Sequence, residues 1–65
     1  MTVAVYRLDA DGYRMKSHKE ITRVTKIVEE NETLIIHTYW SEKRYEEPHI
    51  IDLNTHGVDI YAGRN

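Results

Sequence analysis

The chain contains no cysteine, no phenylalanine, one proline and three glycines among its 65 residues. Without cysteine, disulfide bonds and cysteine-containing zinc sites are excluded as sources of stability. A chain of this length buries only about 60% of the surface that it exposes when unfolded. We therefore expect one small domain over residues 1–65, stabilised by tight packing or by association with another chain.

A long apolar run is also absent, so no segment is expected to span a membrane. The first residues lack the basic region and the apolar stretch of a secretory signal. Both absences predict a cytoplasmic protein with no membrane partner. The formal net charge is only −2, but residues 1–28 carry six basic and three acidic side chains, whereas residues 29–65 carry three basic and eight acidic ones. The two halves are expected to attract each other or different partners.

All six aromatic residues are Tyr or Trp, and each of them carries a polar group that suits a half-exposed position. They are Tyr6, Tyr13, Tyr39, Trp40, Tyr45 and Tyr61. The abundance of such side chains in so short a chain indicates surfaces that recognise another molecule.

The first part of the chain predicts a β-hairpin. Residues 2–8 have the alternating pattern expected of a strand, and Asp and Gly in residues 9–12, Asp-Ala-Asp-Gly, tolerate the positive φ angles of a tight turn. A returning strand is predicted over residues 13–17. Centring this hairpin between residues 10 and 11 places Arg7 opposite Arg14.

This register would divide the hairpin into an apolar face and a basic face. Tyr6 would face Met15, and Leu8 would face Tyr13, on the apolar side. The basic side would hold Arg7, Arg14, Lys16 and His18, with Lys19 and Arg23 nearby. Because like charges opposite each other destabilise a sheet, we expect anions to neutralise this face, either from a partner or from the acidic half of the chain.

Residues 18–30 are ambiguous between helix and strand. Ile21, Val24, Ile27 and Val28 recur at helical spacing. However, six of the eight residues in 21–28 are β-branched, which favours a pleated strand. The prediction is a bulged strand, with a helix over about residues 18–30 as the alternative.

A second hairpin is predicted from residues 33–40 and a returning strand that follows a turn centred at Lys43. This register pairs Ile35 with Ile51 and His37 with His49, and leaves both faces partly apolar. Pro48 cannot donate a hydrogen bond, so the returning strand is expected at an edge or a bulge. A last strand is predicted over residues 58–62.

A two-sided apolar hairpin needs cover on both faces. We therefore predict an all-β fold, a small antiparallel meander that curls into an SH3-like or similar small barrel. A fold of mixed α and β structure, with the helix at about 18–30, is the alternative. A homodimer would cover the second face in another way.

Chemistry-bearing residues give no catalytic or metal-binding motif. His37 and His49 alone do not complete a zinc site, and residues 9–12 lack the later ligands of a calcium loop. The two serines, Ser17 and Ser41, lie in no recognised nucleophile motif. The sequence predicts a protein that is not an enzyme, with no cofactor and no metal.

The predicted function is a small protein-binding or regulatory module, of the inhibitor or accessory kind, whose partner is another protein or a second copy of the chain. The predicted partner-binding residues are Arg7, Tyr13, Arg14, Lys16, Tyr39, Trp40 and Tyr45. One alternative is a nucleic-acid-binding small barrel that uses the basic face of the first hairpin. Another is a structural homo-oligomer. The small size would also suit an accessory protein of a phage or mobile element.

Overall fold

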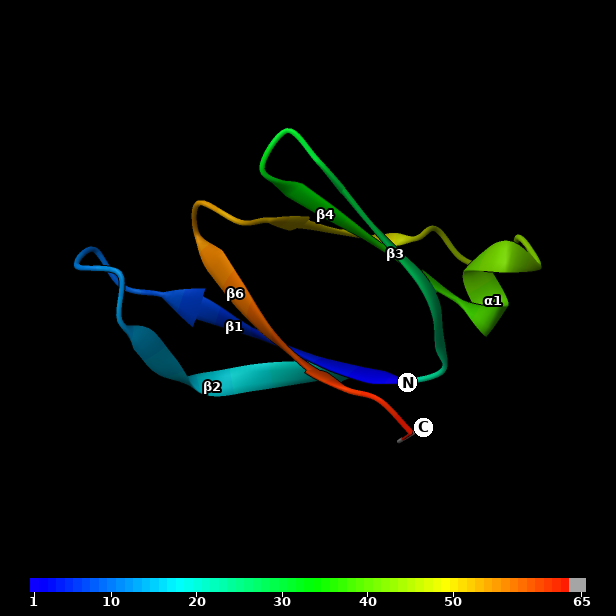
Figure 1. Ribbon diagram of the computed structural model, residues 1–65, viewed down its shortest axis with the longest axis horizontal. Helices are drawn as coiled ribbons and strands as arrows, with labels where there is room; N and C mark the ends of the chain where they lie inside the picture. The colour runs from blue at the N-terminus through cyan, green and yellow to red at the C-terminus, as the bar shows by residue number, and fades with distance from the viewer. Residues whose placement is uncertain (64–65) are drawn as a thin grey trace.

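The computed structural model describes residues 1–63 as two three-stranded antiparallel sheets and a single helical turn (Figure 1). The elements are β1 Thr2–Leu8, β2 Arg14–Ile21, β3 Val24–Glu30, β4 Thr33–Thr38, α1 Tyr39–Glu42, β5 His49–Asp52 and β6 His56–Tyr61. One sheet has the order β2-β1-β6 and the other the order β3-β4-β5. The predicted all-β class is therefore confirmed. The predicted barrel closure is wrong, because β6 returns to the side of β1 and the two sheets remain separate.

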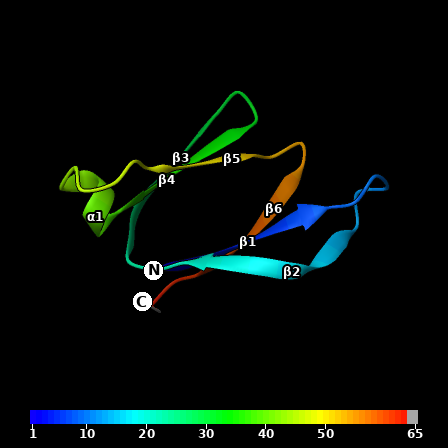
Figure 2. The same cartoon turned by 180° about the vertical axis from the view of Figure 1, so that it is seen from behind.

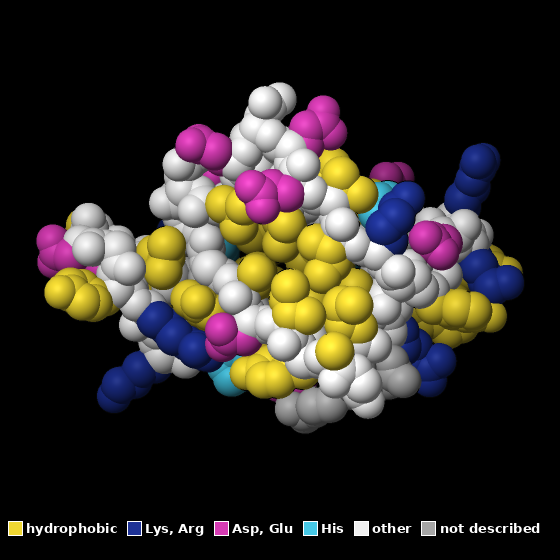
Figure 3. All heavy atoms as spheres, viewed as in Figure 1, with side chains coloured by type: hydrophobic (Ala, Val, Ile, Leu, Met, Phe, Trp, Pro, Cys, Tyr) yellow, Lys and Arg dark blue, Asp and Glu magenta, His cyan; other side chains and the backbone are white. Residues whose placement is uncertain are grey.

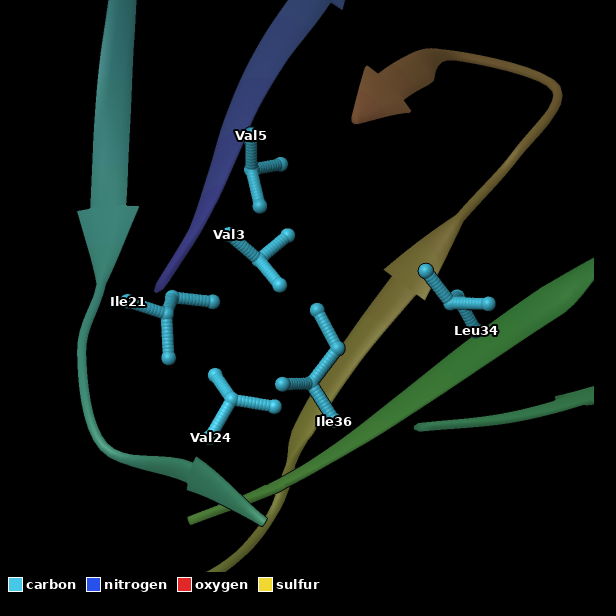
Figure 4. Packing of buried hydrophobic residues seen from close by; sticks show 6 residues of the cluster. All are labelled: Val3, Val5, Ile21, Val24, Leu34 and Ile36. Carbon is cyan, nitrogen blue, oxygen red and sulfur yellow. The ribbon is translucent and has the colours of Figure 1, made fainter. Parts of the chain in front are cut away.

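The core lies between the two sheets. Val3, near the start of β1, and Ile36, in β4, are fully buried, and their side chains point toward each other across the gap (Figure 4). The rest of the buried hydrophobic cluster consists of Val5, Ile21, Val24 and Leu34. Nearly all of these residues are β-branched, so the side chains that favour a strand also fill the core.

Residues 18–30 are extended and connect the two sheets. The strand prediction is confirmed and the helical alternative is wrong, because this stretch contains the end of β2 and all of β3. A sharp change of direction at Thr22 and Arg23, where Arg23 has φ 55°, separates the strands. Ile21 before this corner and Val24 after it both enter the core. The helical spacing thus reflects one chain segment that contributes to both layers of the sandwich.

The first hairpin has the predicted turn but a longer loop. Asp9 Oδ1 accepts hydrogen bonds from the backbone N–H groups of Asp11 and Tyr13, both at 2.9 Å. The Asp9 N–H donates to the Tyr13 carbonyl at 2.8 Å, and Gly12 has φ 85°. The loop therefore contains three residues, closed by a glycine in the left-handed region, where the sequence suggested a two-residue centre.

This loop changes the predicted register between β1 and β2. Leu8 pairs with Arg14, and Tyr6 pairs with His18 in place of Met15. Residues 15–17 of β2 lie opposite the single residue Arg7 of β1, which is a bulge. The predicted pairing of Arg7 with Arg14 is therefore wrong. Arg7 pairs instead with His56 of β6.

The β3–β4 hairpin has a two-residue turn, Asn31-Glu32, in which both residues have positive φ angles of 51° and 61°. After β4, the chain leaves the sheet at Thr38, where the sequence predicted a strand up to residue 40. The Thr38 side chain accepts a hydrogen bond from the Ser41 N–H at 3.1 Å, and the Ser41 hydroxyl accepts one from the Thr38 N–H at 2.8 Å. This capping box begins α1.

The helical turn shifts the second hairpin by one residue from the prediction. Ile36, not His37, pairs with His49, and Ile35 pairs with Ile50. A shift of one residue moves side chains to the opposite face, so His37 and His49 lie on different faces of the sheet. Their predicted juxtaposition is wrong.

The last two strands lie at sheet edges. β5 begins directly after Pro48 and is an edge strand, as predicted. β6 begins two residues earlier than predicted and is the edge of the other sheet. No helix in the described part of the chain has the length and apolar character that a membrane crossing requires.

Candidate binding surfaces

Three of the predicted partner-binding residues meet around α1. The rings of Tyr39 and Trp40 make an edge-to-face contact with centroids 5.0 Å apart, and Trp40 and Tyr45 are tilted with centroids 5.8 Å apart. All three stay accessible, with exposed fractions of 43% for Tyr39, 45% for Trp40 and 76% for Tyr45. We call Tyr39, Trp40 and Tyr45 the aromatic cluster.

Local backbone bonds hold the aromatic cluster together. Thr38 and Ser41 start the helical turn, and Ser41 is buried beneath it. At the end of the turn, Arg44 adopts φ 63°, and the Tyr45 N–H then donates to the Trp40 carbonyl at 3.0 Å. This return of the chain brings Tyr45 back to Trp40. Most of the hydrogen bonds that hold the cluster are therefore short-range, and one longer-range bond joins the Tyr39 N–H to the Arg23 carbonyl at 3.0 Å.

The remaining predicted residues do not join this cluster. Tyr13 is exposed in the β1–β2 turn, and Arg14 and Lys16 follow in β2. Both ribbon views show this turn and α1 at opposite ends of the molecule (Figures 1 and 2). The structure thus divides the predicted binding residues between two distant regions.

The predicted basic face of the first hairpin is not formed. The Arg14 guanidinium lies 4.2 Å from the centroid of the Tyr6 ring, and its Nη1 atom is 2.8 Å from Asp59 Oδ2. Arg14 is thus on the Tyr6 face of the sheet and already has an acidic partner. Arg7, next to Tyr6 along β1, points to the other face, toward the second sheet. Arg14 is paired with Asp59 on the outer face, and the observed register turns Arg7 to the inner face.

The two open sides of the sandwich differ in character. Figure 3 shows hydrophobic side chains gathered in the middle of the side on which β6 lies nearest to the viewer in Figure 1. On β6, Val58 is partly buried against the core and Ile60 is 54% exposed. The opposite side, where β2 and β5 are nearest to the viewer in Figure 2, carries a cationic cleft.

This inter-sheet cleft has a volume of about 330 Å³ and receives side chains from both sheets. Its apolar lining is provided by Val5, Ile21 and Ile51, with Ile50 beside them, and its polar lining by Arg7, Ser17, His18, Lys19, His49 and His56. Neither Asp nor Glu is among these lining residues. The cleft therefore combines an apolar floor with an excess of positive charge.

Sequence reasoning missed this cleft, although it named Arg7. The signal is the order of residues on one face: Val3, Val5 and Arg7 alternate along β1, and Ile21 and Lys19 do so along β2. On both strands, the side chains of the inner face change from apolar to cationic toward the β1–β2 turn. Because the cleft depends on the pairing of Val5 with Lys19, only the correct register reveals it.

No group of three or more His, Cys, Asp or Glu side chains in residues 1–63 has the arrangement of a metal site. The nearest acid–imidazole approaches are long: His49 Nε2 lies 3.7 Å from Glu46 Oε2, and His18 Nε2 lies 3.8 Å from Glu20 Oε2. Comparison with known proteins gave no family model, no curated protein and no solved structure that matches the chain.

Proposed function

We propose that the protein is a small binding module that docks onto another protein through the aromatic cluster. The observation that carries this proposal is the mutual contact of three exposed rings, Tyr39, Trp40 and Tyr45, at one end of the molecule. Tyr and Trp are the side chains that most often anchor protein interfaces, because each buries a large area and loses little side-chain entropy. Rings that already restrain one another lose even less side-chain entropy on binding.

The charges beside the aromatic cluster favour a protein over a nucleic acid as the partner. Glu42, Glu46 and Glu47 lie in the same segment as the rings, together with Lys43 and Arg44. Carboxylates at this density repel a phosphate backbone, whereas a mixed rim of both signs is typical of protein interfaces. The nucleic-acid alternative also lacks its basic face, because Arg7 and Arg14 point to opposite sides of their sheet.

Affinity capture with matched variants tests the proposal. The tagged protein, Trp40→Ala, Tyr45→Ala and Tyr13→Ala are each incubated with extract of the native cell, and retained proteins are quantified by mass spectrometry. Tyr13 is 72% exposed at the far end of the molecule, so Tyr13→Ala removes an aromatic ring outside the cluster. We expect one stoichiometric partner that Tyr13→Ala retains and both cluster variants lose by about tenfold or more, which is the loss typical of an anchor residue.

Two outcomes would refute this function. One is a partner that all four proteins retain equally, because its docking surface would then lie elsewhere. The other is the absence of any stoichiometric partner for the unaltered protein. Light scattering at several concentrations identifies self-association, since a second copy as partner would raise the mass with concentration and Trp40→Ala would abolish that increase.

A further inference from the structure

The inter-sheet cleft is separate from the aromatic cluster and has the character of a binding site. It is formed where the inner faces of β1 and β2 change from apolar to cationic residues. Val5 and Ile21 are buried at its floor, and Arg7 and Lys19 are exposed at its rim. Its volume, about 330 Å³, is at the lower end of the range for small-molecule sites.

We propose that this cleft binds a small amphipathic carboxylate, meaning a molecule with one acid group on an apolar chain or ring. The carboxylate lies between the Arg7 guanidinium and the Lys19 ammonium group. The apolar part covers Val5, Ile21 and Ile51. One ligand of this class places its charged group at the cationic rim and its apolar part on the aliphatic floor.

Within residues 1–63, the two cations at the rim of the cleft have no acidic partner. In the described part of the chain, neither Arg7 nor Lys19 has a carboxylate within salt-bridge distance, whereas Arg14 on the outer face is paired with Asp59. Lys19 pairs with Val5, so Arg7 is its diagonal neighbour on the same face. Two cations so placed repel each other, and an anion between them removes the repulsion. A guanidinium also binds a carboxylate with two parallel hydrogen bonds.

The imidazoles at the rim add further polar groups. His56 pairs with Arg7 across β1 and β6. Its Nδ1 atom lies 2.7 Å from the hydroxyl of Thr55, which leaves Nε2 for a ligand. His49, from the second sheet, faces the same cleft. Polar groups therefore approach the rim from both sheets, while the floor offers only aliphatic carbon.

The apolar floor favours a ligand with an apolar part over a bare phosphate. None of the lining residues is Tyr, Trp or Phe. The floor consists of aliphatic side chains, for which an inorganic anion has no affinity. An alkyl or aryl carboxylate gains from their burial by about 25 cal/mol for each square ångström of apolar surface covered.

An NMR titration tests the proposal directly. The ¹⁵N-labelled protein is titrated with sodium octanoate, and separately with octan-1-ol and with sodium acetate. We expect octanoate to shift the backbone amides of Lys19, Ile51 and His56, with a dissociation constant on the order of 0.1–1 mM. Octan-1-ol lacks the charge and acetate lacks the chain, so each is expected to bind roughly tenfold or more weakly.

Charge variants complete the test. Arg7→Gln and Lys19→Gln are each expected to weaken octanoate binding by roughly threefold to tenfold, because each removes one charged contact at a partly exposed site. Lys26→Gln is the matched control, since Lys26 pairs with His37 on the outer face of the second sheet. This variant is expected to bind like the unaltered protein. Spectra of each variant without ligand show whether the fold is retained.

Three results would overturn the proposal: equal binding of octanoate and octan-1-ol, unchanged affinity in both cleft variants, or shifts that map outside the cleft. Equal binding of acetate would reduce the site to a general anion site and would also count against it. Because the cleft does not include the aromatic cluster, Trp40→Ala is expected to bind octanoate normally. A failure of one proposal therefore leaves the other unaffected.

Discussion

Gly57 on β6 lies directly beneath the ring of Tyr6, its partner on β1. A Cβ atom on Gly57 would be 2.6 Å from Cε2 of Tyr6 and 2.7 Å from both Cζ and the hydroxyl oxygen. These separations are far below the usual contact distance between non-bonded atoms. Gly57→Ala must therefore displace the Tyr6 ring. The φ angle of Gly57 is not positive, so the backbone itself accepts alanine.

Displacement of the ring affects a second contact. Arg14 lies over Tyr6, and an exposed cation–π contact of this kind contributes about 0.5–1 kcal/mol. Forcing a methyl group into a filled site costs about 1–3 kcal/mol. Alanine in a strand is intrinsically more stable than glycine by about 0.5–1 kcal/mol, which offsets part of the cost. We expect Gly57→Ala to lower the free energy of unfolding by about 1–3 kcal/mol.

Tyr6→Ala provides the background in which the same substitution becomes favourable. Without the ring, the methyl group of Gly57→Ala meets no steric obstacle, and the free energy of unfolding should rise by about 0.5–1 kcal/mol. The four proteins form a double-mutant cycle. Urea unfolding followed by circular dichroism measures each one, and a change of 1 kcal/mol moves the midpoint by about 1 M at the urea dependence of a small domain.

Gly12→Ala is the control for this cycle. Gly12 has φ 85° and open space around its Cα, so alanine there costs about 1–2 kcal/mol through backbone strain alone. That cost should be the same with and without the Tyr6 ring. If Gly57→Ala destabilises both backgrounds equally, the ring does not lie where the structure places it and the reasoning is refuted.

Three further substitutions test other parts of the fold. Glu32→Gly is expected to raise the melting temperature by about 2–8 °C, because glycine adopts the positive φ of this turn without strain and the hydrogen bond that it removes, from Asn54 Nδ2 to Glu32 Oε2, is exposed; no increase would contradict that origin. Thr38→Val removes the cap of α1 and should cost about 0.5–2 kcal/mol in urea unfolding, whereas Thr22→Val at an exposed position should cost less than about 0.5 kcal/mol. Ile36→Ala should cost about 2–5 kcal/mol and Ile50→Ala, at 61% exposure, less than about 0.5 kcal/mol; similar costs would place the core elsewhere.

The sequence was sufficient to predict which segments form strands. Residues 2–8 were predicted as a strand and form β1 with those bounds. The β-branched residues between Ile21 and Val28 outweighed their helical spacing, and they form strand structure. Pro48 was correctly associated with an edge. These predictions succeeded because backbone preference and side-chain alternation act over a few neighbouring residues.

The sequence was not sufficient to predict registers, because register depends on the length of each connection. A three-residue loop ending at Gly12 and a bulge opposite Arg7 replaced the expected pairs in the first hairpin. In the second, the cap formed by Thr38 and Ser41 ended the strand early. The first feature leaves the extended residues unchanged, and the second ends the strand at Thr38 in place of residue 40. Each of them changes which face a side chain occupies, and binding sites depend on faces.

The difference between predicting strands and predicting registers explains why only one of the two candidate sites could be predicted from the sequence. The aromatic cluster forms from residues close together in the chain, around a helical turn that its own hydrogen bonds stabilise, so Tyr39, Trp40 and Tyr45 could be named without any register. The cleft forms from four strands, and Lys19 lies beside Val5 because the bulge in β2 shifts the pairing by two residues. If the register of Leu8 with Arg14 continued along the strand without the bulge, Lys19 would pair with Val3, deeper between the sheets. The charge of the cleft, and with it the proposed carboxylate site, therefore depends on the β1–β2 bulge, whereas the aromatic cluster does not.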